Sequence, residues 1–106
     1  MVSFEEFKKL EIRVAQITEV RDHPNADKLY VITIDLGDKT KQIVAGIKSS
    51  YKPEDLVGRQ IAVVDNIEPA VLRGVESQAM LLAATDDKGV AILTLDRKMA
   101  LGSIIK

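Results

Sequence analysis

The chain has 106 residues, of which 46% are hydrophobic, and its 15 Lys and Arg nearly balance 16 Asp and Glu. This length predicts one domain over residues 1–106, and the near-neutral charge argues against a basic module that coats nucleic acid without selectivity. The absence of Cys excludes disulfides and thiolate metal sites. No apolar run approaches the ~20 residues of a membrane span, and the first residues lack a signal-peptide pattern, so we expect a cytoplasmic protein without membrane contact.

The first part of the chain changes from helical to strand periodicity. Ser3 followed by Glu6 fits a capping box, which predicts a short helix over residues 4–9. Apolar and polar residues then alternate between Leu10 and Val20, with a change of phase near Ile17. This pattern indicates a long strand that is bent by a β-bulge.

A turn and a hairpin come next. Residues 23–27 form a turn-prone stretch, and residues 29–36 predict a strand with its even-numbered apolar side chains on one face. Residues 37–39 then close a hairpin into a strand over 42–47.

The second half predicts a short helix followed by further strands. Pro53, two acidic residues and Gly58 mark one or two helical turns. Residues 61–64 predict a strand, residues 67–78 a loop, and residues 80–84 and 90–95 a hairpin. Five to six short strands with a helix between the third and fourth indicate an all-β oligonucleotide/oligosaccharide-binding (OB) fold, a five-stranded barrel with short helices.

The charges are unevenly distributed along the sequence. Residues 39–59 carry three more positive than negative charges, and residues 60–96 carry four more negative than positive charges. This asymmetry predicts either a positive face on a neutral protein or an ordinary solvated surface.

Catalytic patterns are absent from the sequence. The chain has no Cys, one His, no nucleophile-elbow serine and no glycine-rich phosphate loop, so we predict no catalytic residue and no cofactor. His23 is close in sequence to Asp22 and Asp27, which allows either a metal ligand or a capping or solvated histidine. Without further ligand spacing the second interpretation is favoured, and no metal site is predicted.

Two polar segments precede hydrophobic strands, and together they resemble the tRNA-binding domain family. They are His23-Pro24-Asn25-Ala26-Asp27-Lys28-Leu29 and Leu72-Arg73-Gly74-Val75-Glu76-Ser77-Gln78, the second running into Ala79-Met80-Leu81-Leu82. The resemblance extends from Phe4 to about Ile104. This family includes C-terminal domains of bacterial methionyl-tRNA synthetases, separate synthetase β subunits and free-standing homodimeric tRNA-binding proteins.

Three residues of these segments suit a binding role by their own chemistry. Lys28 lies where a turn enters a strand and can pair with a phosphate. Asn25 offers a donor and an acceptor to a sugar or base edge, and is equally a good turn former. Arg73 beside Gly74 can approach an RNA backbone, or it can stabilise its own loop through Glu76.

The resemblance implies a role for the remaining motif residues, Ser77, Gln78 and Met80. It implies that serine and methionine lie on the tRNA-contacting surface, with the hydroxyl and amide near ribose or phosphate and the thioether against a nucleotide. The alternative is that Met80 belongs to the core. The chain has Ala79 where the family usually has Gly, so the geometry of the motif depends on whether that position tolerates a Cβ.

The resemblance also implies function and partners. We expect a non-catalytic module that binds the outer corner of L-shaped tRNA and assists an aminoacyl-tRNA synthetase, in particular methionyl-tRNA synthetase. Family members of this length form homodimers through C-terminal segments, and here Leu101, Ile104 and Ile105 could bury against a second chain or against the barrel's own end. The alternative function is a dimeric peptide-binding secretion chaperone of the same family.

Overall fold

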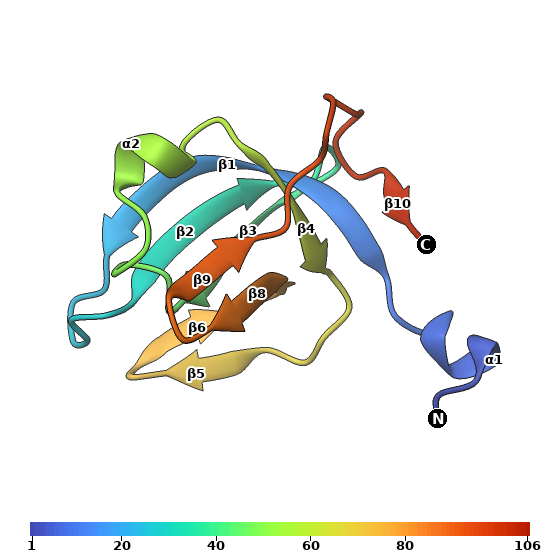
Figure 1. Ribbon diagram of the computed structural model, residues 1–106, viewed down its shortest axis with the longest axis horizontal. Helices are drawn as coiled ribbons and strands as arrows, with labels where there is room; N and C mark the ends of the chain where they lie inside the picture. The colour runs from blue at the N-terminus through green and yellow to red at the C-terminus, as the bar shows by residue number, and fades with distance from the viewer.

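The computed structural model describes residues 1–106, which form a strongly bent antiparallel sheet flanked by two hairpins (Figure 1). The helices are α1 (Phe4–Phe7) and α2 (Pro53–Leu56). The strands are β1 (Ile12–Asp22), β2 (Tyr30–Asp35), β3 (Thr40–Ala45), β4 (Gln60–Val64), β5 (Ala70–Leu72), β6 (Val75–Ser77), β7 (Met80–Leu81), β8 (Ala83–Asp86), β9 (Gly89–Ile92) and β10 (Ile104–Ile105). Neither helix is long and apolar enough to cross a membrane.

The main sheet has the order β3-β2-β1-β4-β7, with β10 added to the first part of β1. Its curvature depends on β1, which pairs with β4 over its first half and with β2 over its second half. The register with β2 shifts between Ile17 and Glu19, which confirms the predicted bulge. The helix α2 lies between β3 and β4, as expected for the predicted all-β, OB-like barrel.

The barrel interior is aliphatic. The even-numbered residues of the predicted second strand are all buried: Tyr30, Ile32, Ile34 and Leu36. Ala79 is 3% exposed and joins the same core cluster, and its φ is not positive, so the Cβ at this position packs in the core without backbone strain.

Two predicted elements differ from the structure. The predicted loop over 67–78 contains the β5–β6 hairpin, in which Leu72 pairs with Val75 across a two-residue turn. The hairpin predicted over 80–84 and 90–95 is formed by β8 and β9, and its turn is shorter than expected, since it consists of Asp87 and Lys88 alone. Met80–Leu81 leaves this hairpin and pairs with the end of β4 instead.

The barrel closes between β3 and residues 76–80 with side-chain oxygens in place of part of a backbone ladder. The Val44 N–H donates to Ser77 Oγ at 2.9 Å, and the Gln42 N–H donates to Gln78 Oε1 at 2.9 Å. One backbone bond completes this closing seam, from the Gln78 N–H to the Gln42 carbonyl at 2.8 Å. Ser77 also donates its hydroxyl proton to the Ala79 carbonyl at 3.0 Å. The seam thereby satisfies the buried N–H of Val44.

Beside the closing seam, Asp65 pairs with three cations, one of which, Lys41, also donates to the Gln78 carbonyl at 3.4 Å. Its Oδ2 lies 2.8 Å from Arg13 Nη1 and 3.0 Å from Lys39 Nζ, and its Oδ1 lies 2.7 Å from Lys41 Nζ. Burial raises the pKa of the Asp65 carboxyl, but the hydrogen bonds from Lys41, Arg13 and Lys39 outweigh it and hold the pKa well below its usual range.

The Asp65 cluster also redistributes the sequence's positive charge. Lys39 and Lys41 belong to the basic segment 39–59, yet both pair with Asp65 from the acidic segment. Lys48 pairs with Asp22 at 3.1 Å. Three lysines of the basic segment are therefore neutralised by ion pairs with acids from other parts of the sequence, and residues 39–59 do not form a uniformly positive face.

The two termini lie at the end of the molecule away from the turn after β1 (Figure 1). Ser3 caps α1 by accepting the Glu6 N–H, as the capping box predicts, but the helix ends at Phe7 and none of its residues is buried. The strand β10 pairs with β1, so the C-terminal segment packs against its own barrel while Ile104 remains 63% exposed.

We predict that Ser77→Ala destabilises the fold. The substitution leaves the buried Val44 N–H without an acceptor, which costs about 1–3 kcal/mol. Urea unfolding measures this loss. Ser49→Ala is the control, since that exposed hydroxyl makes no hydrogen bond within the protein and its removal should change stability by less than ~0.5 kcal/mol. Equal stability of the two variants would contradict the assigned role of Ser77.

We also predict a specific acid dependence of stability. The folded-state pKa of Asp65 is depressed, so its contribution is complete above the unfolded-state value of about 4 and is lost as the pH falls toward the folded-state value. Asp65→Asn should cost up to about 3–5 kcal/mol at pH 7 and flatten the fall of stability below pH ~4. Thermal melts across pH 2–7 compare the two proteins, and parallel profiles would refute the prediction.

Candidate RNA-binding rim

His23 joins the two polar segments that the sequence singles out. Its ring is only 6% exposed, with Nε2 2.9 Å from the Leu72 carbonyl and Nδ1 2.9 Å from the Asn25 backbone nitrogen. Because Nδ1 accepts the Asn25 N–H, the neutral ring carries its proton on Nε2 and donates it to Leu72. The histidine therefore caps its own turn, as the favoured sequence interpretation allowed, but it is buried and not solvated. It also holds the β1–β2 turn against the tip of the β5–β6 hairpin.

Asn25 and Arg73 strengthen this junction reciprocally. Asn25 Nδ2 donates to the Arg73 carbonyl at 3.3 Å, and Arg73 Nη2 donates to the Asn25 carbonyl at 3.2 Å. Arg73 and Gly74 have φ values of 54° and 89°, the combination found in a type I′ turn. A left-handed arginine costs roughly 1–2 kcal/mol, so the Asn25 contacts offset a strained conformation that projects Arg73 from the tip.

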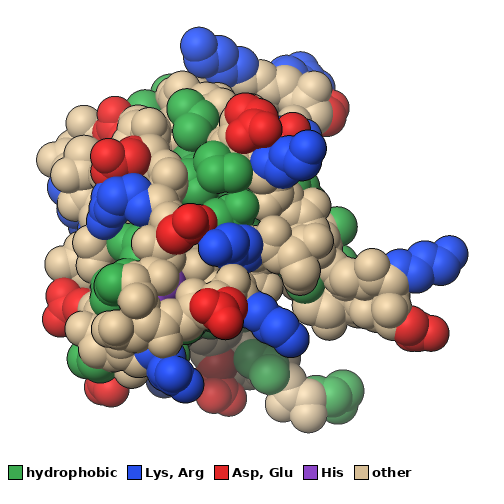
Figure 2. All heavy atoms as spheres, turned by 90° about the vertical axis from the view of Figure 1, so that its left-hand side faces the viewer, with side chains coloured by type: hydrophobic (Ala, Val, Ile, Leu, Met, Phe, Trp, Pro, Cys, Tyr) green, Lys and Arg blue, Asp and Glu red, His purple; other side chains and the backbone are tan.

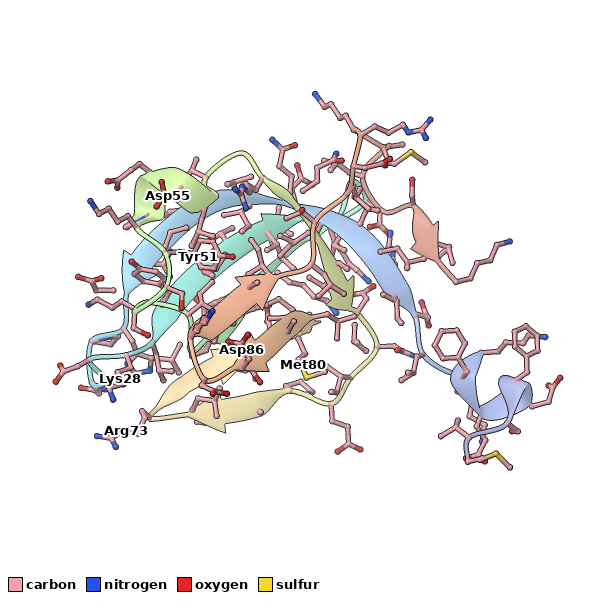
Figure 3. All side chains as sticks on the ribbon, in the orientation of Figure 1. Lys28, Tyr51, Asp55, Arg73, Met80 and Asp86 are labelled. Carbon is pink, nitrogen blue, oxygen red and sulfur yellow. The ribbon has the colours of Figure 1, made fainter.

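Lys28 and Arg73 project from the same end of the molecule (Figure 3). Lys28 is exposed and has no ion-pair partner within the protein, and Arg73 also lacks a carboxylate partner. The alternative pairing of Arg73 with Glu76 is not formed, since its guanidinium reaches the Asn25 carbonyl instead. These two positive groups, with the amide of Asn25, form a basic rim that can bind phosphate oxygens.

Met80 lies on the surface, 45% exposed, so the alternative of a core methionine is wrong. It borders a pocket of about 150 Å³ between β3 and the β5–β6 hairpin, lined by Val44, Ile67, Glu68, Ala70, Leu72, Ser77, Ala79 and Met80. Six of these eight residues are hydrophobic. The thioether and its apolar neighbours suit a flat, weakly polar group such as a nucleobase face.

Ser77 and Gln78 differ from their expected role. Ser77 is 7% exposed, and its oxygen and proton are both used inside the barrel. The Gln78 amide accepts from Gln42 and donates to Glu76 Oε1 at 3.1 Å. Their polar groups are therefore committed to the closing seam, and a hydroxyl offered to ribose or phosphate is not available. The two side chains set the path of the chain that carries Met80.

The rim lacks aromatic rings on which bases could stack. The Tyr30 hydroxyl donates to the Tyr51 carbonyl at 2.7 Å, and the Tyr51 hydroxyl accepts the Ile92 N–H at 3.1 Å, so both tyrosines support the interior. Figure 2, which faces the end with the β1–β2 turn, shows basic and acidic side chains interspersed and only a small part of the histidine. Such a surface favours a few positioned contacts over a continuous positive field.

Sequence reasoning missed His23 as the residue that connects the rim. It also missed the β5–β6 hairpin, because Arg is unusual at the first position of a type I′ turn, where Asn or Asp is expected before Gly. A signal was present in the Arg73-Gly74 pair between apolar residues. No group of three or more His, Cys, Asp or Glu side chains is placed to hold a metal ion.

Known proteins resemble this chain in sequence and in fold. Residues 12–104 match the family described as "putative tRNA binding domain". A methionine–tRNA ligase of Thermococcus kodakarensis is 56% identical over 105 residues, which are 99% of this chain and 14% of the ligase. The chain thus spans about one seventh of that relative's length.

Two solved structures share the whole fold. A MetRS-related protein from Pyrococcus horikoshii superimposes with a TM-score of 0.92 at 28% identity, covering 100% of this chain and 98% of the other. The CsaA chaperone protein from Picrophilus torridus superimposes with a TM-score of 0.93 at 33% identity, covering 100% of both chains. The family match covers the barrel and both polar segments, and the chain belongs to the putative tRNA-binding domain family.

Proposed function

We propose that this chain binds the outer corner of tRNA without catalysing a reaction. The observation that carries the proposal is the basic rim, in which His23 brings Lys28 and Arg73 to one end of the barrel. The family to which the chain belongs supports tRNA as the ligand. Positive groups at a rim without stacking aromatics suit recognition of a folded RNA by its backbone and shape.

The pocket beside Met80 gives the proposed interface a second kind of contact. Phosphate pairing at Lys28 and Arg73 supplies affinity and orientation, and an apolar pocket supplies a place for one unstacked base. In this proposal Ser77 and Gln78 act by positioning Met80, through the seam to Gln42 and Val44. Asn25 acts by holding the Arg73 turn.

The proposed partner is an aminoacyl-tRNA synthetase, most directly methionyl-tRNA synthetase in the cytoplasm. Support comes from the methionine–tRNA ligase relatives, of whose length this chain spans about 14%. A module that holds tRNA weakly raises its effective concentration at a linked catalytic unit. Attachment to the synthetase or association with it would serve this purpose equally well.

A peptide-binding chaperone role is the second candidate, and the match to the CsaA chaperone protein supports it. Such a role would use apolar surface, whereas the proposed tRNA contact uses charges. A salt series separates them, because phosphate contacts release counterions and weaken steeply with salt while an apolar groove does not. Binding of total tRNA in a gel-shift titration is the first experiment, and no binding at low salt would contradict the proposed function.

Homodimerisation is a further part of the proposal. The short helix α1 leaves Phe4 70% exposed and buries none of its residues, and the exposed Ile104 also lies at the terminal end. Exposed phenylalanines on a helix that does not pack on its own barrel suit burial against a second copy. The C-terminal segment contributes its exposed face to this proposal, since its other side already packs on β1.

Lys28→Ala should weaken tRNA binding to a similar extent for all tRNA species. Loss of one phosphate contact should lower the slope of log affinity against log salt by about one unit or slightly less. A fluorescence titration at several salt concentrations measures the slope. Lys106→Ala removes the same charge at the opposite end and should leave the slope unchanged. A slope that stays at the parent value in Lys28→Ala removes this residue from the interface.

Met80→Ala should separate binding from stability. An exposed substitution changes stability by about 0.5 kcal/mol or less. The lost sulfur–base contact should reduce tRNA affinity roughly two- to tenfold. Leu93→Ala, at a side chain of similar exposure (43%), is the control for both measurements. A variant that melts with the parent and also binds tRNA with the parent's affinity would exclude a base contact at Met80.

Substituting both Phe4 and Phe7 by Ser should convert the proposed dimer to monomer. Because α1 has no buried residue, the barrel should fold as before. Sedimentation equilibrium measures the mass, and Val71→Ser removes an exposed apolar side chain from the other end as a control. A dimer that persists in the double variant would place the interface elsewhere.

A further inference from the structure

A second basic site lies outside the rim, in a groove along the top of the barrel as drawn in Figure 1. Its walls are the chain after α2 and the chain after β9. The groove has a volume of about 460 Å³ and is lined by Gln16, Gly58, Arg59, Gln60, Thr94, Leu95, Arg97 and Lys98. Three of these residues are cationic and none is acidic, in a protein whose acids outnumber its bases by 16 to 15.

Both walls of the groove are fixed by hydrogen bonds. The Gly58 N–H donates to the Ile17 carbonyl at 2.8 Å, and the Ile17 N–H donates to the Arg59 carbonyl at 2.9 Å. On the other side Gln60 Nε2 donates to the Met99 carbonyl at 2.7 Å while the Met99 N–H donates to Gln60 Oε1 at 2.9 Å. The backbone that carries the cations is therefore in place before any ligand arrives.

The functional groups of the groove remain available. The side chains of Arg59 and Lys98 make no ion pair or hydrogen bond within the protein, and neither do the Gln16 amide and the Thr94 hydroxyl. Arg97 has only a distant partner, with 3.7 Å between its Nε and Asp96 Oδ1, and the two side chains are 79% and 87% exposed. Three positive groups, one amide and one hydroxyl thus belong to residues that line one open groove, and all can donate to an anion.

We propose that this groove binds the phosphodiester backbone of the RNA that the rim holds. The proposal rests on the proposed tRNA-binding function and adds a second contact region to it. The groove is open and its cations are exposed, so each pairing with a single small anion is weak. A polymer that is already held at the rim presents further phosphates at high effective concentration, which favours RNA over free phosphate.

The size of the protein makes a shared ligand feasible. Its extents are 38 × 30 × 29 Å. A duplex carries about one phosphate per 1.7 Å of its axis, so a helical arm lying along the barrel passes many phosphates across any basic groove. Lys28 and Arg73 lie at the lower left of Figure 3, and the groove's walls run along the top, so an RNA in contact with both would follow one side of the molecule.

The test compares three forms of the full chain: the parent, a groove variant (R59Q, R97Q and K98Q), and a control that loses the same charge elsewhere (K9Q, K88Q and K106Q). Each is titrated with total tRNA over a salt series. In a separate titration with inorganic phosphate, binding is monitored by the amide chemical shifts. The groove variant should lower the salt slope by about two to three units and bind tRNA roughly tenfold more weakly, with the parent's melting temperature. The control should match the parent.

The other outcomes overturn the proposal in distinguishable ways. If the parent binds tRNA and the groove variant has the same affinity and slope, the groove takes no part while the proposed function survives. If the variant loses only its response to inorganic phosphate, the groove holds a small anion and not RNA. If the parent binds no tRNA, the proposed function fails together with this one. Should the triple variant melt early, Lys98→Gln alone must still lower the slope by about one unit.

Discussion

The β5–β6 hairpin is held at both ends by polar side chains, and the candidate site depends on that restraint. At its base, the side chains of Ser77 and Gln78 accept hydrogen bonds from backbone N–H groups of β3 and close the barrel. At its tip, the buried His23 ring links the Leu72 carbonyl to the β1–β2 turn. A three-residue strand paired only with its neighbour would be marginal alone. The two attachments turn it into a rigid support for Arg73 and the pocket at Met80.

Ion pairing within the fold decides which cations remain free for a ligand. Asp65 takes up Lys39 and Lys41 together with Arg13, all at the end of the sheet away from the rim. Lys28 at the rim and the cations of the groove have no comparable acid beside them. A chain with almost no net charge can still present local basic sites where exposed cations such as Lys28, Arg59 and Lys98 have no carboxylate partner.

The sequence predicts the barrel well because its main signals are local. The capping box at Ser3, the phase change near Ile17 and the alternation after Leu29 each report on neighbouring residues. The candidate site was harder to predict from the sequence, because its geometry depends on contacts between residues about fifty positions apart. Asn25 with Arg73 and His23 with Leu72 are such pairs. Ser77 illustrates the limit: its place in the motif is evident, but only the fold reveals that its hydroxyl faces Val44.

In the proposed interface, His23 unites the two polar segments into one binding rim. The most direct test of this role compares the tRNA affinity of His23→Phe with that of the parent, under conditions in which both proteins are folded. The ring volume is kept and both hydrogen bonds are lost, so stability should fall by about 1–3 kcal/mol. The tRNA salt slope should fall by one to two units, because Lys28 and Arg73 no longer reach phosphates together. A folded variant with the parent's affinity and slope would show that tRNA binding does not depend on the His23 junction.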